Sequence, residues 1–145
     1  VLVHSGPPTS SISDRIAAIV REATAGRDVV CPLRNDTRVP VASVQTVVRN
    51  LIHLHNLEKA KLRGKRGFNQ PALTVSMDDI AASVSRVRNG KPPGKITFAP
   101  DPELKQIVDG WPKGLISTRA ASIGTTSDRN FDDIVAGYLK SLQGK

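Results

Sequence analysis

Aromatic residues, cysteine and long apolar runs are scarce in this chain of 145 residues, and each scarcity excludes a class of protein. One tryptophan, one tyrosine and three phenylalanines leave the core to aliphatic side chains. The single cysteine, Cys31, excludes an internal disulfide and agrees with a reducing compartment. No run approaches the ~18 apolar residues that span a bilayer, and no signal-peptide pattern opens the chain. We therefore expect a soluble, cytoplasmic protein with no membrane partner.

The length predicts a single domain, because two domains of ordinary size need more residues. The first residues, Val1-Leu2-Val3, have the character of the middle of a buried strand. Such a strand needs neighbours on both sides. We therefore expect that the chain was cut from a longer protein.

Basic residues outnumber acidic ones by 21 to 13, and the formal net charge is +8. A positive field of this size favours anionic partners. The densest basic run, at 59–66, is followed by one aromatic residue, Phe68. Grooves that bind nucleic acid usually place several aromatic side chains among the charges for base stacking. We interpret the run as a solvated loop and do not expect nucleic acid as a partner.

Apolar residues at helical spacing, together with capping residues, predict five helices that alternate with short extended stretches. This alternation indicates an α/β fold. The clearest stripe predicts an amphipathic helix with His53 toward solvent, and it comprises Val44, Val47, Val48, Leu51 and Leu54. The helices are expected between Ser13 and Gly26 and at 43–56, 76–87, 101–110 and 130–139, with a short turn at 118–123. The extended stretches are expected at 1–4, 28–32, 38–42, 67–69 and 95–99.

The chain carries no complete motif for a phosphate loop, a metal site or an activated nucleophile. The spacing from Gly90 to Lys95 is one residue too short for a phosphate loop. His53 and His55 lie two apart on a predicted helix, so their side chains diverge. No Gly-x-Ser-x-Gly elbow is present. We expect neither a catalytic residue nor a metal ligand in this chain.

Two arginines are candidates for binding an anion. Arg38 begins an extended stretch just before a helix, and Arg119 lies in the short turn after Trp111. An arginine at a strand-to-helix junction can form a bidentate pair with a carboxylate or a phosphate. From spacing alone, a surface salt bridge is the alternative for both residues.

Three motifs occur in an order that is similar to a known family. They are DTRVPVAS at 36–43 before an amphipathic helix, FNQP at 68–71 before a capped helix, and STRA at 117–120 before the last helix. This order resembles the late region of extended short-chain dehydrogenases of the NAD-dependent epimerase/dehydratase group. Together with Cys31-Pro32 and Trp111-Pro112, it looks closest to the D-erythronate dehydrogenase-like branch. The resemblance covers about residues 14–140.

The resemblance implies that residues 1–145 form the C-terminal substrate-binding part of a Rossmann-type extended short-chain dehydrogenase. Residues 1–13 would end the Rossmann sheet and form an active-site loop. Family members bind NAD or NADP at a glycine-rich turn and use a Tyr-x-x-x-Lys pair in catalysis. Here Leu142 stands four residues after Tyr138, the single tyrosine, and the glycine turn is missing. The N-terminal cofactor domain is therefore expected to be absent, and whether the chain alone is an enzyme stays open.

For the site, the resemblance implies substrate contacts from Arg38 and Arg119 and cofactor contacts from His4, Ser5 and Gly6. Relatives tend to carry Arg-Pro-Gly where His4-Ser5-Gly6 stands, which removes one anion contact. The expected partners are a small-molecule substrate and, for the full-length protein, a second copy in a homodimer.

Two functions from different classes remain. The leading hypothesis is the substrate-binding part of an NAD(P)-dependent oxidoreductase or epimerase-like enzyme that acts on a small hydroxy acid or a sugar-derived substrate. The alternative is a standalone, non-catalytic basic module that binds anions or nucleic acid through the run at 59–66.

Overall fold

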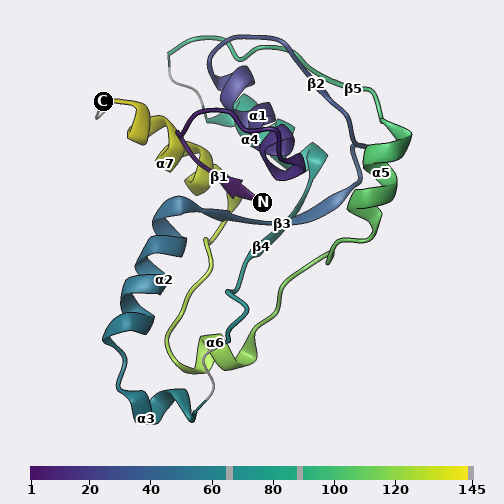
Figure 1. Cartoon of the computed structure of the whole chain (residues 1–145). Coiled ribbons are helices and arrows are strands. Elements are labelled where there is room, and N and C mark those ends of the chain that lie inside the picture. The colour runs from purple at the N-terminus through teal and green to yellow at the C-terminus, as the bar shows by residue number, and fades with distance from the viewer. Residues whose placement is uncertain (65–66, 88–89, 144–145) are drawn as a thin grey trace.

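The computed structural model describes residues 1–64, 67–87 and 90–143, which form an upper and a lower part (Figure 1). The upper part holds all the labelled strands with α1, α4, α5 and α7, and the lower part holds α2, α3 and α6. The helices are α1 (Ile12–Thr24), α2 (Val44–Asn56), α3 (Lys59–Leu62), α4 (Met77–Arg86), α5 (Pro102–Asp109), α6 (Thr118–Ser122) and α7 (Phe131–Gln143). The strands are β1 (Leu2–Val3), β2 (Val29–Cys31), β3 (Arg38–Ser43), β4 (Leu73–Ser76) and β5 (Ile96–Phe98). The predicted mixture of helices and short strands is confirmed.

Two small sheets organise the upper part. One has the order β1-β3-β4, in which β1 runs parallel to β3 and β4 runs antiparallel to it. The other pairs β2 with β5 in parallel. Helix α4 packs against both α1 and α7, and the three helices bury an aliphatic core with the sheets. Its largest fully buried side chains include Ile16, Ile19, Leu33, Met77, Ile80 and Ile134.

Local capping signals account for the helix boundaries that the sequence predicts. Ser76 and Asp79 form a complete capping box at the start of α4, with both reciprocal bonds present. Asp101 accepts bonds from the backbone of Glu103 and Leu104 at the start of α5, where Pro102 fills the first helical position. The predicted turn at 118–123 is the helix α6.

Two local expectations differ from the structure. The basic run, predicted as a loop, contains the four-residue helix α3. The stretch at 67–69 is outside any strand, and β4 forms a few residues later. Across residues 1–64, 67–87 and 90–143, every helix falls short of the length and apolar character that a membrane span requires.

Helix α2 buries two polar side chains most deeply, and its predicted apolar stripe is divided, with Val48 and Leu51 exposed and the other three residues partly buried. Thr46 and Asn50 are its buried residues, whereas Leu51 and Ile52 are 55% and 57% exposed. Asn50 is bonded to both the N–H and the carbonyl of Thr126. His53, predicted toward solvent, contacts the carbonyl of Ile123 through Nε2 at 2.6 Å and is partly buried. The polar side is inward because these side chains satisfy backbone groups of the loop before α7.

The burial of Asn50 and the exposure of Leu51 on α2 predict that substitutions of these neighbouring residues affect the free energy of unfolding to different extents. Asn50→Ala should lower the free energy of unfolding by roughly 2 kcal/mol, because it removes a buried amide and its two hydrogen bonds to the backbone of Thr126. Leu51→Ala should change it by less than about 0.5 kcal/mol, since its side chain is exposed. Urea unfolding of both variants measures the difference. A larger loss of stability for Leu51→Ala than for Asn50→Ala would show that the apolar stripe is the packed face.

Gly94 is required by a close approach between two backbone segments. A Cβ at this position would lie 2.0 Å from the carbonyl oxygen of Arg27. The N–H of Gly94 also bonds the carbonyl of Ala23 at the end of α1. This contact leads the chain into β5 beside β2, so a side chain at residue 94 would separate the two strands.

Gly94→Ala should therefore destabilise the protein by about 1–3 kcal/mol, the usual cost of overpacking. Gly67→Ala is the matched control, because a Cβ there meets no atom within 4 Å. Thermal unfolding followed by circular dichroism should show a lower midpoint for Gly94→Ala alone. Equal midpoints for the two variants would contradict the close approach.

Candidate functional site

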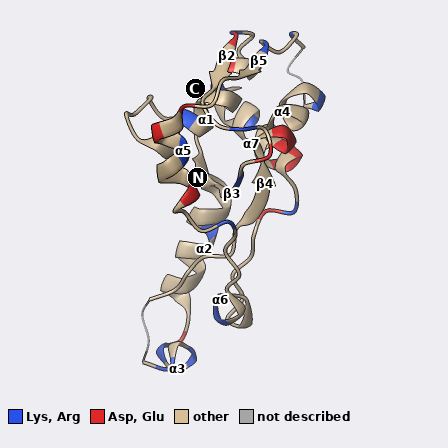
Figure 2. Cartoon of the chain, turned by 90° about the vertical axis from the view of Figure 1, so that its right-hand side faces the viewer, with Lys and Arg blue, Asp and Glu red and all other residues tan. Residues whose placement is uncertain are grey.

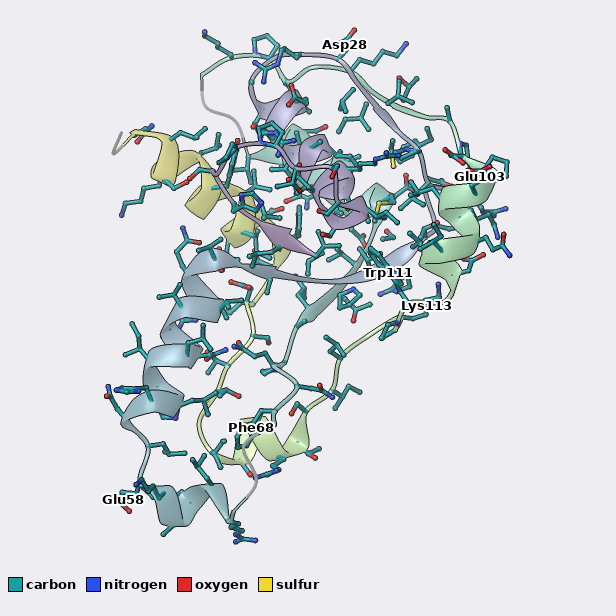
Figure 3. All side chains as sticks on the ribbon, in the orientation of Figure 1. Asp28, Glu58, Phe68, Glu103, Trp111 and Lys113 are labelled. Atoms are coloured by element: carbon teal, nitrogen blue, oxygen red, sulfur yellow. The ribbon has the colours of Figure 1, made fainter. Side chains whose placement is uncertain are left out.

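Arg38 lies at the start of β3, at the rim of a basic hollow of about 350 Å³. The hollow is formed by the loop before β3 with the first residue of that strand, one side of α5 and Lys113 in the segment after α5. Figure 3 labels Lys113 just beyond α5, next to the start of β3. The lining side chains are Arg34, Asp36, Thr37, Arg38, Lys105, Asp109 and Lys113. Sequence analysis identified Arg38 alone among these residues.

Ion pairs occupy most of the charges in this hollow. Arg34 donates to both carboxylate oxygens of Asp36, at 2.9 and 2.8 Å. Asp109 pairs with Lys105 and, at 3.6 Å, with Lys113. The hydrogen bond from Arg34 lowers the pKa of Asp36, and the hydrogen bond from Lys105 lowers that of Asp109, so both carboxylates are charged at neutral pH.

Arg38 has no carboxylate partner within ion-pair distance among the residues that the structure describes. Its Cα is paired with that of Ser76 on β4, and its charge contributes to lowering the pKa of Asp79, which the hydrogen bonds with Ser76 lower most. Arg38 is therefore the cation through which this hollow can bind an anionic group of a small molecule.

The segment predicted to lie near a cofactor folds back on the start of α1. Nδ1 of His4 accepts a bond from the N–H of Gly6, and Nε2 of His4 lies 3.5 Å from Oδ1 of Asp14. A Cβ on Gly6 would lie 2.9 Å from Nδ1 of the His4 ring, so a side chain at residue 6 would require the ring to move. Ser5 lies between these two residues. The three residues form one turn attached to α1.

Asp14 connects that turn to the rest of the upper part. Its carboxylate is buried and accepts bonds from Arg21, at 3.1 and 3.4 Å, and from the N–H of Thr9. Burial by itself would raise the pKa of Asp14. The bond from Thr9 and the hydrogen bond and charge of Arg21 outweigh burial, and the pKa is lowered.

A second hollow, of about 400 Å³, lies beside β1 and brings the N-terminal segment next to the predicted FNQP motif. Val1, Leu2 and Ser13 line one side of it. The other lining residues are Pro40, Val41, Ala42, Val47, Phe68, Asn69, Gln70, Pro71, Ala72 and Leu115. The wall is mostly apolar, with the amides of Asn69 and Gln70 as polar groups, which is typical of small-molecule sites.

Arg119, the other predicted anion contact, is in the lower part. Its guanidinium stacks on Phe68, with 4.4 Å from Cζ to the ring centroid, and donates to the carbonyl of Leu62 at 2.7 Å. It lines a third hollow with Lys61, Arg63, Ser122 and Ile123. The structure thus places Arg38 and Arg119 in different hollows.

Sequence reasoning missed Arg34, Lys105 and Lys113. The spacing of Lys105, Asp109 and Lys113, four residues apart each time, places the first two on one side of a helix and the third just beyond it. These three residues lie next to the start of β3 because of tertiary packing, which the local sequence does not indicate. Within the described parts of the chain, no three His, Cys, Asp or Glu side chains group as metal ligands would.

Comparison with solved structures defines the class of the fold. The nucleoside-diphosphate-sugar epimerase of Agrobacterium tumefaciens superimposes with a TM-score of 0.86 at 23% identity, covering 98% of this chain and 42% of that one. A GalE-like L-threonine dehydrogenase of Cupriavidus necator, in its holo form, gives 0.83 at 24%, covering 97% and 45%. The fold is that of the C-terminal part of an extended short-chain dehydrogenase.

Within that class, the sequence is similar to D-erythronate dehydrogenases, which confirms the predicted resemblance. The Haemophilus influenzae protein of that name is 28% identical over 140 residues, covering 97% of this chain and 44% of the relative. The Cupriavidus necator protein is 26% identical over 140 residues, covering 97% and 43%. No protein-family model matches the chain. The chain spans less than half the length of these relatives, and the comparisons give no support to a standalone basic module.

Asp14→Asn should lower the free energy of unfolding by about 2 kcal/mol at pH 7, because it removes charged hydrogen bonds at a buried site. Folding lowers the pKa of Asp14. Its contribution is therefore complete above the ordinary carboxyl pKa of about 3.9 and is lost as the pH falls through the folded value. Urea unfolding should show the same difference from wild type at pH 7 and pH 5 and a smaller one near pH 3.

Glu58→Gln is the control for this pH series, because Glu58 is exposed and its side chain makes no capping bond to α3. Glu58→Gln should leave the free energy of unfolding nearly unchanged at pH 7, pH 5 and pH 3. A difference for Asp14→Asn that stays constant down to pH 3 would show that the carboxylate is not stabilised by folding.

Proposed function

We propose that this chain is the substrate-binding C-terminal part of an NAD(P)-dependent dehydrogenase or epimerase-like enzyme that acts on a small hydroxy acid or a sugar-derived substrate. The continuous similarity to two D-erythronate dehydrogenases supports the reaction class. The observation that carries the proposal is the basic hollow at the start of β3, where Arg38 has no described carboxylate partner.

In this proposal Arg38 orients the substrate by its anionic group. The planar guanidinium offers paired N–H donors that match a carboxylate or a phosphate. Asp36 and Asp109 neutralise neighbouring cations, so the hollow keeps a modest positive charge and does not collect anions indiscriminately. The apolar hollow beside β1, with Asn69 and Gln70 on its wall, would contact the uncharged part of the substrate.

The cofactor that the resemblance implies would meet this chain at His4, Ser5 and Gly6. The His4 ring occupies the space beside Gly6, so the turn presents a polar edge and does not form a cradle for phosphates. NAD or NADP would supply hydride transfer, and a preceding cofactor domain would hold it. Residues of the segment 1–13 that lie next to β1 would cover the active site on the side formed by this chain.

Substitution of Arg38 in the complete natural enzyme tests this assignment. With D-erythronate and NAD or NADP, Arg38→Gln should raise the KM for the acid about tenfold or more, the expected loss for a charged hydrogen bond near solvent. It should leave the KM for the cofactor unchanged. Arg15→Gln, which removes an exposed charge on α1, is the matched control.

Two results would overturn the proposal at different levels. An unchanged KM for the acid in Arg38→Gln would remove Arg38 from the site. A natural protein whose intact mass equals that of this chain, and which reduces neither NAD nor NADP with any hydroxy acid, would exclude the dehydrogenase function.

A further inference from the structure

The hollow that contains Arg119 is lined by residues of α3 and α6 and of the segments that follow them. Both helices are in the lower part of the molecule, whereas α5 is in the upper part (Figure 1). Its volume is about 640 Å³, within the range of small-molecule sites. Lys61 and Arg63 line it from α3 and its end, and Arg119, Ser122 and Ile123 line it from α6 and its end. Figure 2 shows blue segments on both of these helices, whereas the larger red segments are in the upper part.

The charge in this hollow is of one sign. Its lining has three cations and no carboxylate, in contrast to the hollow at Arg38, where two carboxylates are present. Within the described ranges, Lys61 and Arg63 make no ion pair. Three cations that face one space repel one another, and an anion bound among them relieves that repulsion.

One of the three cations, and the backbone that carries a second, are held in position before any ligand binds. Arg119 is fixed by its stacking on Phe68 and by its bond to the carbonyl of Leu62. Arg63 ends α3 in the left-handed conformation, with φ of 49°, and its N–H bonds the carbonyl of Ala60. The bond from Arg119 to Leu62 joins α6 to α3, so both walls of the hollow are connected through one of its own cations.

We propose that this hollow is a second anion site, which binds a small molecule that carries a phosphate group. A monoanionic carboxylate needs one cation, whereas three cations that line one hollow match the dianionic charge and the several acceptor oxygens of a phosphate ester. Ile123 and Ser122 supply an apolar and a polar surface for the organic part of the ligand. This hollow shares no lining residue with the hollow at Arg38, and Phe68, on which Arg119 stacks, also lines the hollow beside β1.

Titration with inorganic pyrophosphate at low ionic strength tests the proposal, since salt screens exposed charges. Calorimetry should show saturable one-to-one binding by the protein. The double variant Lys61→Gln/Arg63→Asn should weaken binding at least tenfold. Asparagine is chosen at residue 63 because it tolerates the left-handed conformation. Amide NMR shifts on binding should centre on Ser122 and Ile123.

The matched control is Arg15→Gln/Lys140→Gln, which removes two exposed charges outside all three hollows described above. It should change affinity less than twofold. Equal weakening by both double variants would show a response to net charge alone and would overturn the proposal. Binding that is lost in Arg38→Gln but kept in Lys61→Gln/Arg63→Asn would assign the anion to the other hollow, and absence of saturable binding would exclude the site.

Discussion

The carboxylate of Asp128 fixes the lower part of the molecule to the upper part. Its Oδ2 accepts from the N–H of Ser43, and its Oδ1 accepts from the hydroxyls of Ser43 and Thr46, both at 2.7 Å. Ser43 is the last residue of β3 and the N-cap of α2, so a single side chain joins a strand, a helix start and the loop before α7. The orientation of α2 follows from this attachment, because it holds that loop against one side of the helix.

This orientation of α2 leaves three of its apolar side chains exposed. Val48, Leu51 and Ile52 are each about half exposed, and each forgoes on the order of 1 kcal/mol of burial. The polar side gains hydrogen bonds from the buried amide of Asn50 and the partly buried ring of His53 to the backbone of Thr126 and Ile123. An unpaired buried amide would cost as much as the lost burial or more. The hydrogen bonds therefore decide which side of α2 faces inward.

Much of the fold, and little of the site, could be predicted from the sequence. Capping signals such as Ser76 with Asp79 depend on residues three apart, so local sequence contains them completely. The burial of Asn50 depends on Thr126, which lies 76 residues away, and an apolar stripe gives no sign of it. Arg38 was predicted as a candidate because a strand-to-helix junction is visible in sequence. Its neighbours across the hollow, Lys105 and Lys113, are brought there by packing alone.

The two predicted arginines differ in how they can act on an anion. Arg38 is exposed and surrounded by partly neutralised charges, so its field is screened by salt and its contribution depends on a ligand that brings its own apolar contacts. Arg119 is half-buried, stacked on Phe68 and bonded to Leu62, so little side-chain entropy remains to be lost on binding. The preorganised side chain of Arg119 favours tight binding of an anion, whereas the accessible side chain of Arg38 favours rapid binding and release of an anion. Under the proposed function, an enzyme must release its product, so Arg38 would suit substrate turnover and the hollow at Arg119 would suit sustained binding.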